Sequence, residues 1–171
     1  MPRPALFLDR DGVINRRLPD AYVRYPDEFE LLPDVLPILA HARSCGMLLI
    51  LITNQQGVGK GLMTNAELDL VHSHMQQQLI QHIGFALDAV YSCTDLATTS
   101  SPRRKPAPGM LLEAIAEHDI DAAASWFLGD SLTDAQAGRA AGVRTILVGP
   151  FQASDADVVV PDLASVRITA P

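Results

Sequence analysis

Two carboxylates stand two residues apart directly after a short apolar segment near the start of the chain. Residues 5–8 are all apolar, and Asp9-Arg10-Asp11-Gly12 follows them. Like charges this close repel one another and resist desolvation, so we expect Asp9 and Asp11 to bind a cation or share a proton. Taken alone, the Asp11-Gly12 pair could instead do no more than reverse the chain.

Three further apolar segments lead into polar groups that would complement such a pair. Their sequences are Thr53-Asn54-Gln55, Arg103-Arg104-Lys105-Pro106 and Gly129-Asp130-Ser131-Leu132-Thr133-Asp134. Each has an ordinary alternative: Thr53 can cap a helix, the basic run can be exposed surface, and Asp130 can be an N-cap. Together they supply what phosphoryl transfer needs, with Asp9 to attack, carboxylates for magnesium, and Thr53 and Lys105 to hold the phosphoryl group.

The elements that must position these groups alternate along the chain between apolar runs and helical patterns. The apolar runs predict strands over residues 5–8, 47–52, 89–93, 125–128, 145–148 and 158–160. The helical patterns predict helices over residues 34–45, 65–83, 109–118 and 132–141. Gly46 and Gly142 are expected to end two of these helices, and Thr64-Asn65-Ala66-Glu67 is a capping-box pattern.

Strands that are apolar along their whole length are typical of a parallel sheet with helices on both faces. The sequence therefore predicts a doubly wound, Rossmann-like α/β fold, and its length predicts one domain over residues 1–171. In such folds ligands bind beyond the carboxyl ends of the strands. The polar groups described above follow such ends, so we expect them to surround one point.

Composition limits the class of partner. The net charge of -7 argues against a broad basic surface for nucleic acid. The longest apolar run, residues 47–52, is far shorter than the roughly 20 residues that span a bilayer, and no signal peptide precedes Asp9. Cys45 and Cys93 make no disulfide framework and are expected to be core thiols. We expect a cytoplasmic protein that acts on a small phosphate ester.

In their types and order, the four motifs closely resemble those of the haloacid dehalogenase-type phosphatases. That family shares an Asp-x-Asp motif, a Thr or Ser, a Lys and a late acidic motif, and the resemblance covers residues 5–150. It implies that Asp9 is the nucleophile and Asp11 the acid/base partner. It also implies that Thr53 and Lys105 are phosphoryl ligands.

The same resemblance implies a magnesium site. Its ligands would be Asp9, the backbone carbonyl of Asp11, and Asp130. Asp134 matches the second acid of the late motif, and we expect it to balance charge near the metal without direct coordination.

Three segments resemble a subgroup that contains histidinol-phosphatase and D,D-heptose 1,7-bisphosphate phosphatase. They are Leu8-Asp9-Arg10-Asp11-Gly12, Thr53-Asn54-Gln55 and Arg104-Lys105-Pro106-Ala107-Pro108-Gly109-Met110. The resemblance implies a sugar bisphosphate such as D-glycero-D-manno-heptose 1,7-bisphosphate as substrate, with histidinol phosphate as the alternative. In that subgroup a loop usually holds zinc through three Cys and one His. Here only Cys93 is present and no His occurs between Tyr91 and Lys105, so zinc is not expected.

No large insertion separates the motifs, so the resemblance implies a minimal cap and an open site. Loop residues must then select the substrate. The candidates for this contact are Asn54, Arg104, Tyr22 and Arg24. The sequence does not indicate an oligomeric state.

Several other patterns carry less weight. Gly57-Val58-Gly59-Lys60-Gly61 lacks the glycine and hydroxyl spacing of a phosphate-binding loop, and we expect a mobile turn near the site. His72 and His74 should point to different faces of their helix, as surface or interface residues. A non-catalytic receiver-like phosphate sensor remains an alternative, but receivers place the phosphorylated Asp after the third strand. A dehalogenase on the same fold would not need Asp11.

Overall fold

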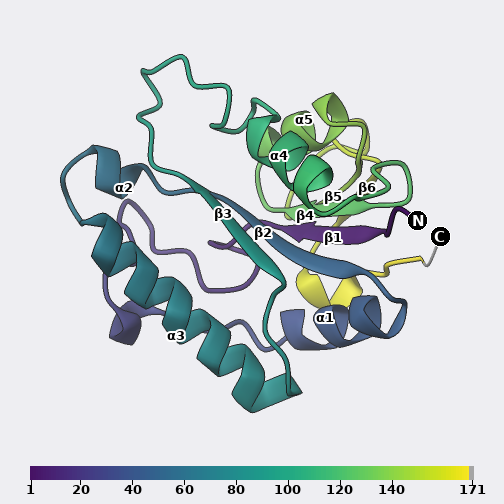
Figure 1. Ribbon diagram of the computed structural model, residues 1–171, viewed down its shortest axis with the longest axis horizontal. Coiled ribbons are helices and arrows are strands. Elements are labelled where there is room, and N and C mark those ends of the chain that lie inside the picture. The colour runs from purple at the N-terminus through teal and green to yellow at the C-terminus, as the bar shows by residue number, and fades with distance from the viewer. Residues whose placement is uncertain (170–171) are drawn as a thin grey trace.

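The computed structural model describes residues 1–169, and its centre is a sheet of six strands (Figure 1). The strands are β1 (Ala5–Leu8), β2 (Leu48–Asn54), β3 (Ala89–Cys93), β4 (Trp126–Gly129), β5 (Arg144–Val148) and β6 (Val158–Val160). Their order is β3-β2-β1-β4-β5-β6, and each neighbouring pair is parallel. The predicted doubly wound fold is confirmed. The direction of winding reverses between β1 and β4, which is where such folds bind ligands.

The helices lie in the connections between these strands, except for η2, which follows β6. They are α1 (Val35–Ser44), α2 (Gln56–Gly59), α3 (Asn65–Ile83), α4 (Gly109–Glu117) and α5 (Leu132–Ala140), with the 3-10 helices η1 (Pro26–Glu28) and η2 (Leu163–Ser165). The four predicted helices begin and end within one residue of these bounds. Thr64 forms the predicted capping box, since its hydroxyl accepts from the Glu67 N–H and Glu67 accepts from the Thr64 N–H. Gly46 and Gly142 both have a φ of 76°, the left-handed conformation expected at a helix end.

Alternate residues of β1 pack on opposite faces of the sheet. Leu6 and Leu8 belong to the apolar cluster that includes α1 and α3, whereas Ala5 and Phe7 belong to the cluster that includes α4. Figure 1 shows α1 and α3 on one side of the sheet and α4 and α5 on the other. Because both faces are covered, every position of β1 is buried, and each large apolar side chain contributes roughly 1.5–3 kcal/mol by leaving water.

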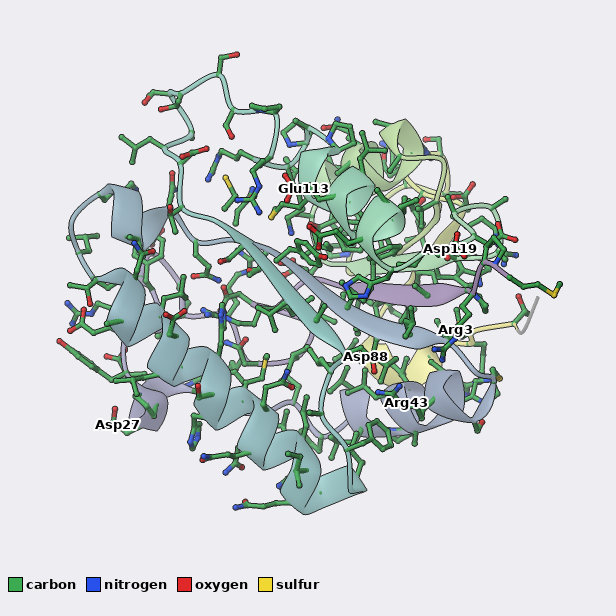
Figure 2. All side chains as sticks on the ribbon, viewed as in Figure 1. Arg3, Asp27, Arg43, Asp88, Glu113 and Asp119 are labelled. Atoms are coloured by element: carbon green, nitrogen blue, oxygen red, sulfur yellow. The ribbon has the colours of Figure 1, made fainter. Side chains whose placement is uncertain are left out.

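An ion pair connects α1 to the amino-terminal ends of β2 and β3, at the edge of the sheet opposite the polar motifs. Arg43 near the end of α1 donates to both carboxylate oxygens of Asp88, each at 3.0 Å (Figure 2). Asp88 also accepts from the Leu49 N–H at 2.7 Å. This contact joins α1 to the starts of β2 and β3. It therefore lies at the edge of the sheet opposite the carboxyl ends, where the polar motifs are found.

Two expectations about individual residues were wrong. His72 was expected at the surface or at an interface, but only 8% of it is exposed. Its position on α3 shares a stripe with Leu68, Val71, Met75 and Leu79, and this spacing places it on the buried face. Cys45 was expected in the core and is partly exposed, whereas Cys93 is buried as predicted.

The connections at the carboxyl edge of the sheet do not form a separate cap domain within the described residues. Residues 10–34 contain only η1, and α2 is a single helical turn in the segment where a mobile turn was expected. The loop that follows β3 first extends away from the sheet (Figure 1), and it returns to the carboxyl edge at Lys105, which is buried there. This is the minimal cap that the resemblance implies. No helix within residues 1–169 combines the length and the apolar character needed to cross a membrane.

Candidate active site

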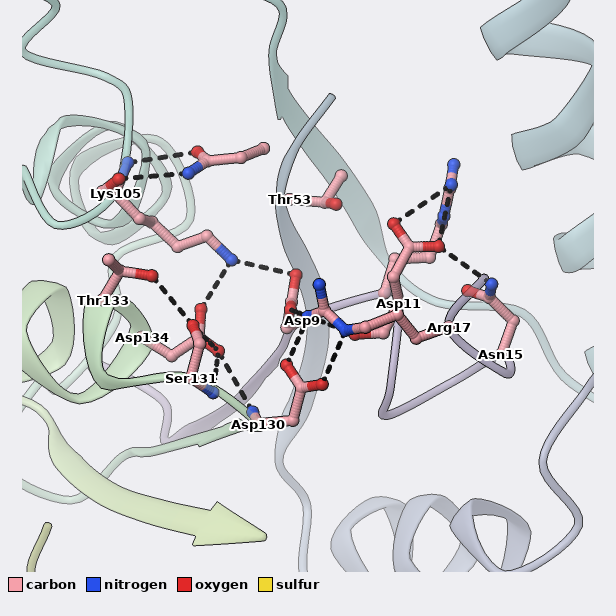
Figure 3. A network of polar contacts seen from close by, with 12 residues as sticks. Asp9, Asp11, Asn15, Arg17, Thr53, Lys105, Asp130, Ser131, Thr133 and Asp134 are labelled. Atoms are coloured by element: carbon pink, nitrogen blue, oxygen red, sulfur yellow. Dashed lines mark hydrogen bonds and ion pairs between the residues drawn. The ribbon is translucent and has the colours of Figure 1, made fainter. Parts of the chain in front are cut away.

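Three carboxylates meet where the winding of the sheet reverses (Figure 3). Asp9 directly follows β1, Asp130 directly follows β4, and Asp134 lies in the first turn of α5. One oxygen from each lies within 4.8 Å of the others. Carboxylate oxygens are the hard ligands that Mg²⁺ prefers, so this edge of the sheet could hold a magnesium ion.

Lys105 lies against this carboxylate cluster. Its Nζ donates to Asp9 Oδ1 at 2.9 Å, to Asp134 Oδ1 at 2.7 Å and to the carbonyl of Ile52 at 2.9 Å. Burial lowers the pKa of Lys105, but the charges of Asp134 and Asp9 outweigh this effect and hold the pKa above its ordinary value. The side chain is therefore a buried ammonium, and all three of its donors are used.

The backbone of Lys105 is fixed by Asn54 at the end of β2. Asn54 donates through Nδ2 to the Lys105 carbonyl, and the Lys105 N–H donates to Asn54 Oδ1, both at 3.1 Å. One side-chain amide thus pairs with both the N–H and the carbonyl of Lys105, and it fixes the loop that carries Lys105 to the end of β2. Asn54 therefore positions Lys105, in addition to lining the pocket described below.

Both oxygens of Asp134 are occupied by protein donors. Oδ1 accepts from Lys105, while Oδ2 accepts from the N–H groups of Asp130 and Ser131, both at 3.1 Å. The close approach needs Gly129, since a Cβ there would lie 2.3 Å from the Asp134 Cβ. The carboxylate thus caps α5 and balances the charge of Lys105, which leaves little room for it to bind a metal directly.

Asp9 has an unusual charge environment. Burial and the neighbouring Asp134 carboxylate raise the pKa of Asp9 to about 8, although the Lys105 ammonium opposes the shift. The charge of Lys105 therefore does not fully compensate the effect of burial and of Asp134 on Asp9. A divalent cation among these oxygens would relieve the repulsion and favour the ionised form of Asp9, and the donor set thus fits magnesium.

The Asp11 side chain lies beside the carboxylate cluster and accepts hydrogen bonds from a separate set of residues (Figure 3). It accepts from Arg10 at 3.1 and 3.2 Å, from Asn15 at 2.9 Å and from Gln55 at 2.9 Å. Burial raises the pKa of Asp11, but the Arg10 guanidinium and these hydrogen bonds outweigh burial and bring the pKa below its usual range. Asp11 is thus held as a carboxylate in one orientation.

Arg10 is in turn supported by a neutral histidine. The arginine is fully buried, and its Nη1 lies 3.2 Å from His72 Nε2. Burial and the nearby Arg10 charge lower the pKa of His72 to about 3, so His72 accepts this hydrogen bond as the neutral imidazole. The sequence interpretation missed both roles. An arginine between two aspartates after a buried strand, and a histidine on an apolar helical stripe, were the signals available.

We expect His72→Gln to flatten the acid side of the stability profile. In the unfolded chain the histidine takes up a proton below about pH 6.5, whereas folded His72 stays neutral down to about pH 3. Between these values the unfolded state binds more protons, so wild-type stability falls as pH falls. From pH 7 to pH 5, urea unfolding should show that the wild type loses roughly 1–2 kcal/mol more than the variant. Equal slopes for His72→Gln and wild type would contradict the assignment.

A pocket opens above Asp9 and Asp11. Its volume is about 270 Å³, and its lining includes Tyr22, Asn54 and Arg104 among the expected substrate contacts. Tyr22 accepts from the Lys60 ammonium at 2.9 Å. Arg24 is directed elsewhere, with its guanidinium 5.4 Å from the centre of the Tyr25 ring. Arg17, which the sequence did not single out, also lines the pocket.

Thr53 is fully buried at the end of β2. Its Oγ1 accepts from Gln55 Nε2 at 2.9 Å, and the same amide donates to Asp11. The structure therefore links Thr53 to Asp11 through Gln55, which the sequence analysis named only as the last residue of the Thr53-Asn54-Gln55 motif. The Thr53 hydroxyl hydrogen remains available to another acceptor.

A doubly wound sheet with buried carboxylates, a lysine and a polar pocket at its switch point is the arrangement that metal-assisted phosphoryl transfer requires. The HAD-hydrolase-like family model matches residues 102–166. D-glycero-beta-D-manno-heptose-1,7-bisphosphate 7-phosphatase of Helicobacter pylori (strain ATCC 700392 / 26695) is 38% identical over 144 residues, which are 84% of this chain and 82% of the relative. The D-glycero-alpha-D-manno-heptose-1,7-bisphosphate 7-phosphatase of Mycobacterium tuberculosis (strain CDC 1551 / Oshkosh) is 40% identical over 130 residues. These residues are 75% of this chain and 68% of the relative.

Among solved structures, D,D-heptose 1,7-bisphosphate phosphatase from B. bronchiseptica, complexed with magnesium and phosphate, is similar over nearly the whole fold. The TM-score is 0.84 at 34% sequence identity, covering 95% of this chain and 94% of the other. The chain belongs to the haloacid dehalogenase-like phosphatase family. The resemblance seen in the motifs is thereby confirmed, and the receiver-like and dehalogenase alternatives are not supported.

Proposed function

We propose that the protein is a magnesium-dependent phosphomonoester hydrolase that acts on a small sugar bisphosphate, D-glycero-D-manno-heptose 1,7-bisphosphate being the best candidate. The observation that carries this proposal is the meeting of Asp9, Asp130 and Lys105 at the switch point of the sheet, beneath a pocket whose lining also includes Arg17 and Arg104. Relatives that are 38% and 40% identical are named for removal of the 7-phosphate of this sugar. We therefore assign the 7-phosphate as the group removed.

In the proposed reaction Asp9 attacks the phosphorus atom, and the bond between phosphorus and the sugar oxygen breaks. Asp11 gives a proton to the departing alkoxide, and it then takes a proton from the water that hydrolyses the aspartyl phosphate. The resting state of Asp11 is the carboxylate, because Arg10, Asn15 and Gln55 all donate to it. Asp11 must therefore first take up a proton, either from solvent or from the singly protonated phosphate ester as it binds, before it can give one to the alkoxide.

Lys105 and Thr53 are proposed to hold the phosphoryl oxygens. Lys105 bridges Asp9 and Asp134, so its charge already lies at the site, and it would exchange its hydrogen bond to Asp9 for one to a phosphoryl oxygen when Asp9 attacks. Thr53 has its own hydroxyl hydrogen to donate, since Gln55 supplies the hydrogen bond that its oxygen accepts. Donors placed in advance around a transferring phosphoryl group stabilise the charge that spreads over its oxygens.

The metal site is proposed to consist of Asp9, the backbone carbonyl of Asp11, and Asp130. Magnesium bound there would screen the repulsion between Asp9 and the incoming phosphate. The described part of the chain groups carboxylates, not cysteines and histidines, at this edge. Cys93 Sγ contacts Asp95 and Ser101 instead. The absence of zinc stays a prediction, which elemental analysis of the purified protein can check.

The charge of the pocket favours a bisphosphate over histidinol phosphate. Arg17, Arg104 and Lys105 line the same pocket as Asp9 and Asp11. Once the acidic residues have bound magnesium and the first phosphate, the arginines remain to attract a second anionic group, whereas the amine of histidinol phosphate would be repelled. Arg24 remains a proposed contact only for a substrate that reaches beyond this pocket.

With Mg²⁺ present, we expect kcat/KM for D-glycero-D-manno-heptose 1,7-bisphosphate to exceed that for histidinol phosphate and for nucleotides by about tenfold or more. Both anomers should be assayed by phosphate release, because relatives are named for each. Excess EDTA should abolish turnover and added Mg²⁺ should restore it. Full activity in EDTA, or a preference for nucleotides, would refute the proposal.

We further propose that residues 1–171 act as one domain in the cytoplasm, on a small molecule and not on nucleic acid or a membrane. The acidic composition argues against nucleic acid as the partner. The oligomeric state is open.

A further inference from the structure

Arg17 contacts the same three groups that are proposed to bind magnesium. Its Nη2 donates to Asp130 Oδ1 at 2.8 Å and to the Asp11 carbonyl at 3.2 Å, and it lies 4.0 Å from Asp9 Oδ2. Its Nε donates to the second oxygen of Asp130 at 3.1 Å. Figure 3 shows the guanidinium between Asp130 and Asp11. The Arg17 side chain thus lies against all three groups of the proposed magnesium site.

A guanidinium in this position and a magnesium ion exclude one another. Mg²⁺ needs its ligand oxygens at about 2.0–2.1 Å, in near-octahedral geometry. The Arg17 nitrogens lie among those oxygens at hydrogen-bond distance. The two cations would also repel each other. Magnesium can therefore use Asp130 and the Asp11 carbonyl only after Arg17 has moved away.

Release of Arg17 is physically easy. Its side chain is 54% exposed, so departure restores water to a group that is only half desolvated. Arg17 also lines the pocket above Asp9, beside Leu18 and Tyr22. A short swing about its own side-chain bonds would move the charge from the carboxylates towards the space that a substrate must fill.

We propose that Arg17 is a displaceable internal cation, which balances Asp9 and Asp130 until Mg²⁺ binds and then turns to the anionic substrate. This inference rests on the proposed magnesium site. It makes Arg17 a determinant of metal affinity, since the fraction of molecules with Arg17 in place cannot bind the metal. Arg17 also links the two binding steps, because metal binding frees the guanidinium that the substrate uses.

The chain offers two matched controls. Arg16 is the neighbouring residue, and its guanidinium pairs with Glu30 at 2.6 Å, away from the carboxylate cluster. Arg104 lines the same pocket, but it donates to the backbone carbonyl of Asp95 at 3.0 Å. Arg16→Ala controls for the loss of a charge from the same segment, and Arg104→Ala controls for the loss of a charge from the pocket.

Isothermal titration calorimetry with MgCl₂ and chelator-treated protein tests the exchange without any substrate. Arg17→Ala should bind Mg²⁺ about three- to tenfold more tightly than wild type, because no ion pair has to be broken first. The two controls should change the dissociation constant by less than about twofold. In EDTA, Arg17→Ala should melt at a lower temperature than wild type, and saturating Mg²⁺ should remove most of that difference.

Unchanged or weaker Mg²⁺ binding by Arg17→Ala would overturn the exchange, as would an equal gain in Arg104→Ala. If wild type and Arg17→Ala both fail to bind Mg²⁺, the metal site and the exchange fall together. Failure of the proposed function is a separate result: a wild type that binds Mg²⁺ with the predicted order of affinities, yet releases no phosphate from the heptose bisphosphate, would leave the exchange standing.

Discussion

Asp9→Asn should lower kcat for every phosphate ester by about 10⁴-fold or more, because the amide cannot form an aspartyl phosphate. The change removes one oxygen and leaves the shape of the side chain. Its remaining oxygen can still accept from the Lys105 ammonium, which the wild-type carboxylate does at 2.9 Å. Steady-state assays with the heptose bisphosphate and with p-nitrophenyl phosphate would measure the loss.

The stability of this variant separates chemistry from folding. Burial and Asp134 raise the pKa of Asp9 to about 8, so its negative charge is unfavourable in the folded chain without a metal. Asp9→Asn should therefore unfold in EDTA at the same urea concentration as wild type or at a higher one. A variant that is inactive only because it has unfolded would contradict this account, and so would a folded variant that keeps more than about a hundredth of the activity.

Asp11→Asn should damage the two half-reactions to different degrees, depending on the leaving group. A phenolate leaves without much help, so p-nitrophenyl phosphate should still phosphorylate Asp9, while hydrolysis of the intermediate slows by roughly 10²–10⁴-fold. A sugar alkoxide needs a proton, so with the heptose bisphosphate both steps should slow. Rapid mixing with p-nitrophenyl phosphate should show a burst of nitrophenolate followed by slow turnover.

The structure supplies the reason that Asn is a suitable test at this position. Asp11 accepts from Arg10, Asn15 and Gln55. Asparagine can keep some of these hydrogen bonds through its amide oxygen, but it cannot carry a proton to and from the substrate. Equal losses with the aryl and the alkyl ester, without a burst, would show that Asp11 acts only by holding the site together.

Much of the fold could be predicted because β1 and its neighbours are buried on both faces. Complete burial makes these strands apolar throughout, which separates them from the amphipathic helices between them. The chemistry at their carboxyl ends then follows from topology, since parallel strands end at one edge. This reasoning placed Asp9, Lys105 and Asp130 near one another without any knowledge of their contacts.

The contacts that the sequence did not reveal are made by residues of the loops and by the buried face of α3. Arg17 meets Asp130 across 113 positions of sequence, and nothing local distinguishes it from Arg16, which pairs with Glu30 instead. His72 was judged by its distance from His74 and not by the apolar stripe that carries it. Arg24 looked equivalent to Arg104, yet its guanidinium lies over the Tyr25 ring and it is not among the residues that line the pocket.

The central claim is that the phosphoryl group passes through Asp9, and mapping of the phosphorylated residue tests it most directly. Asp11→Asn should be mixed with p-nitrophenyl phosphate and Mg²⁺, quenched in acid during the burst, digested and analysed by mass spectrometry. The account predicts phosphate on the peptide that contains Asp9, at that residue, and none when Asp9→Asn is treated in the same way. Phosphate on any other residue, or an equal burst from Asp9→Asn, would contradict it.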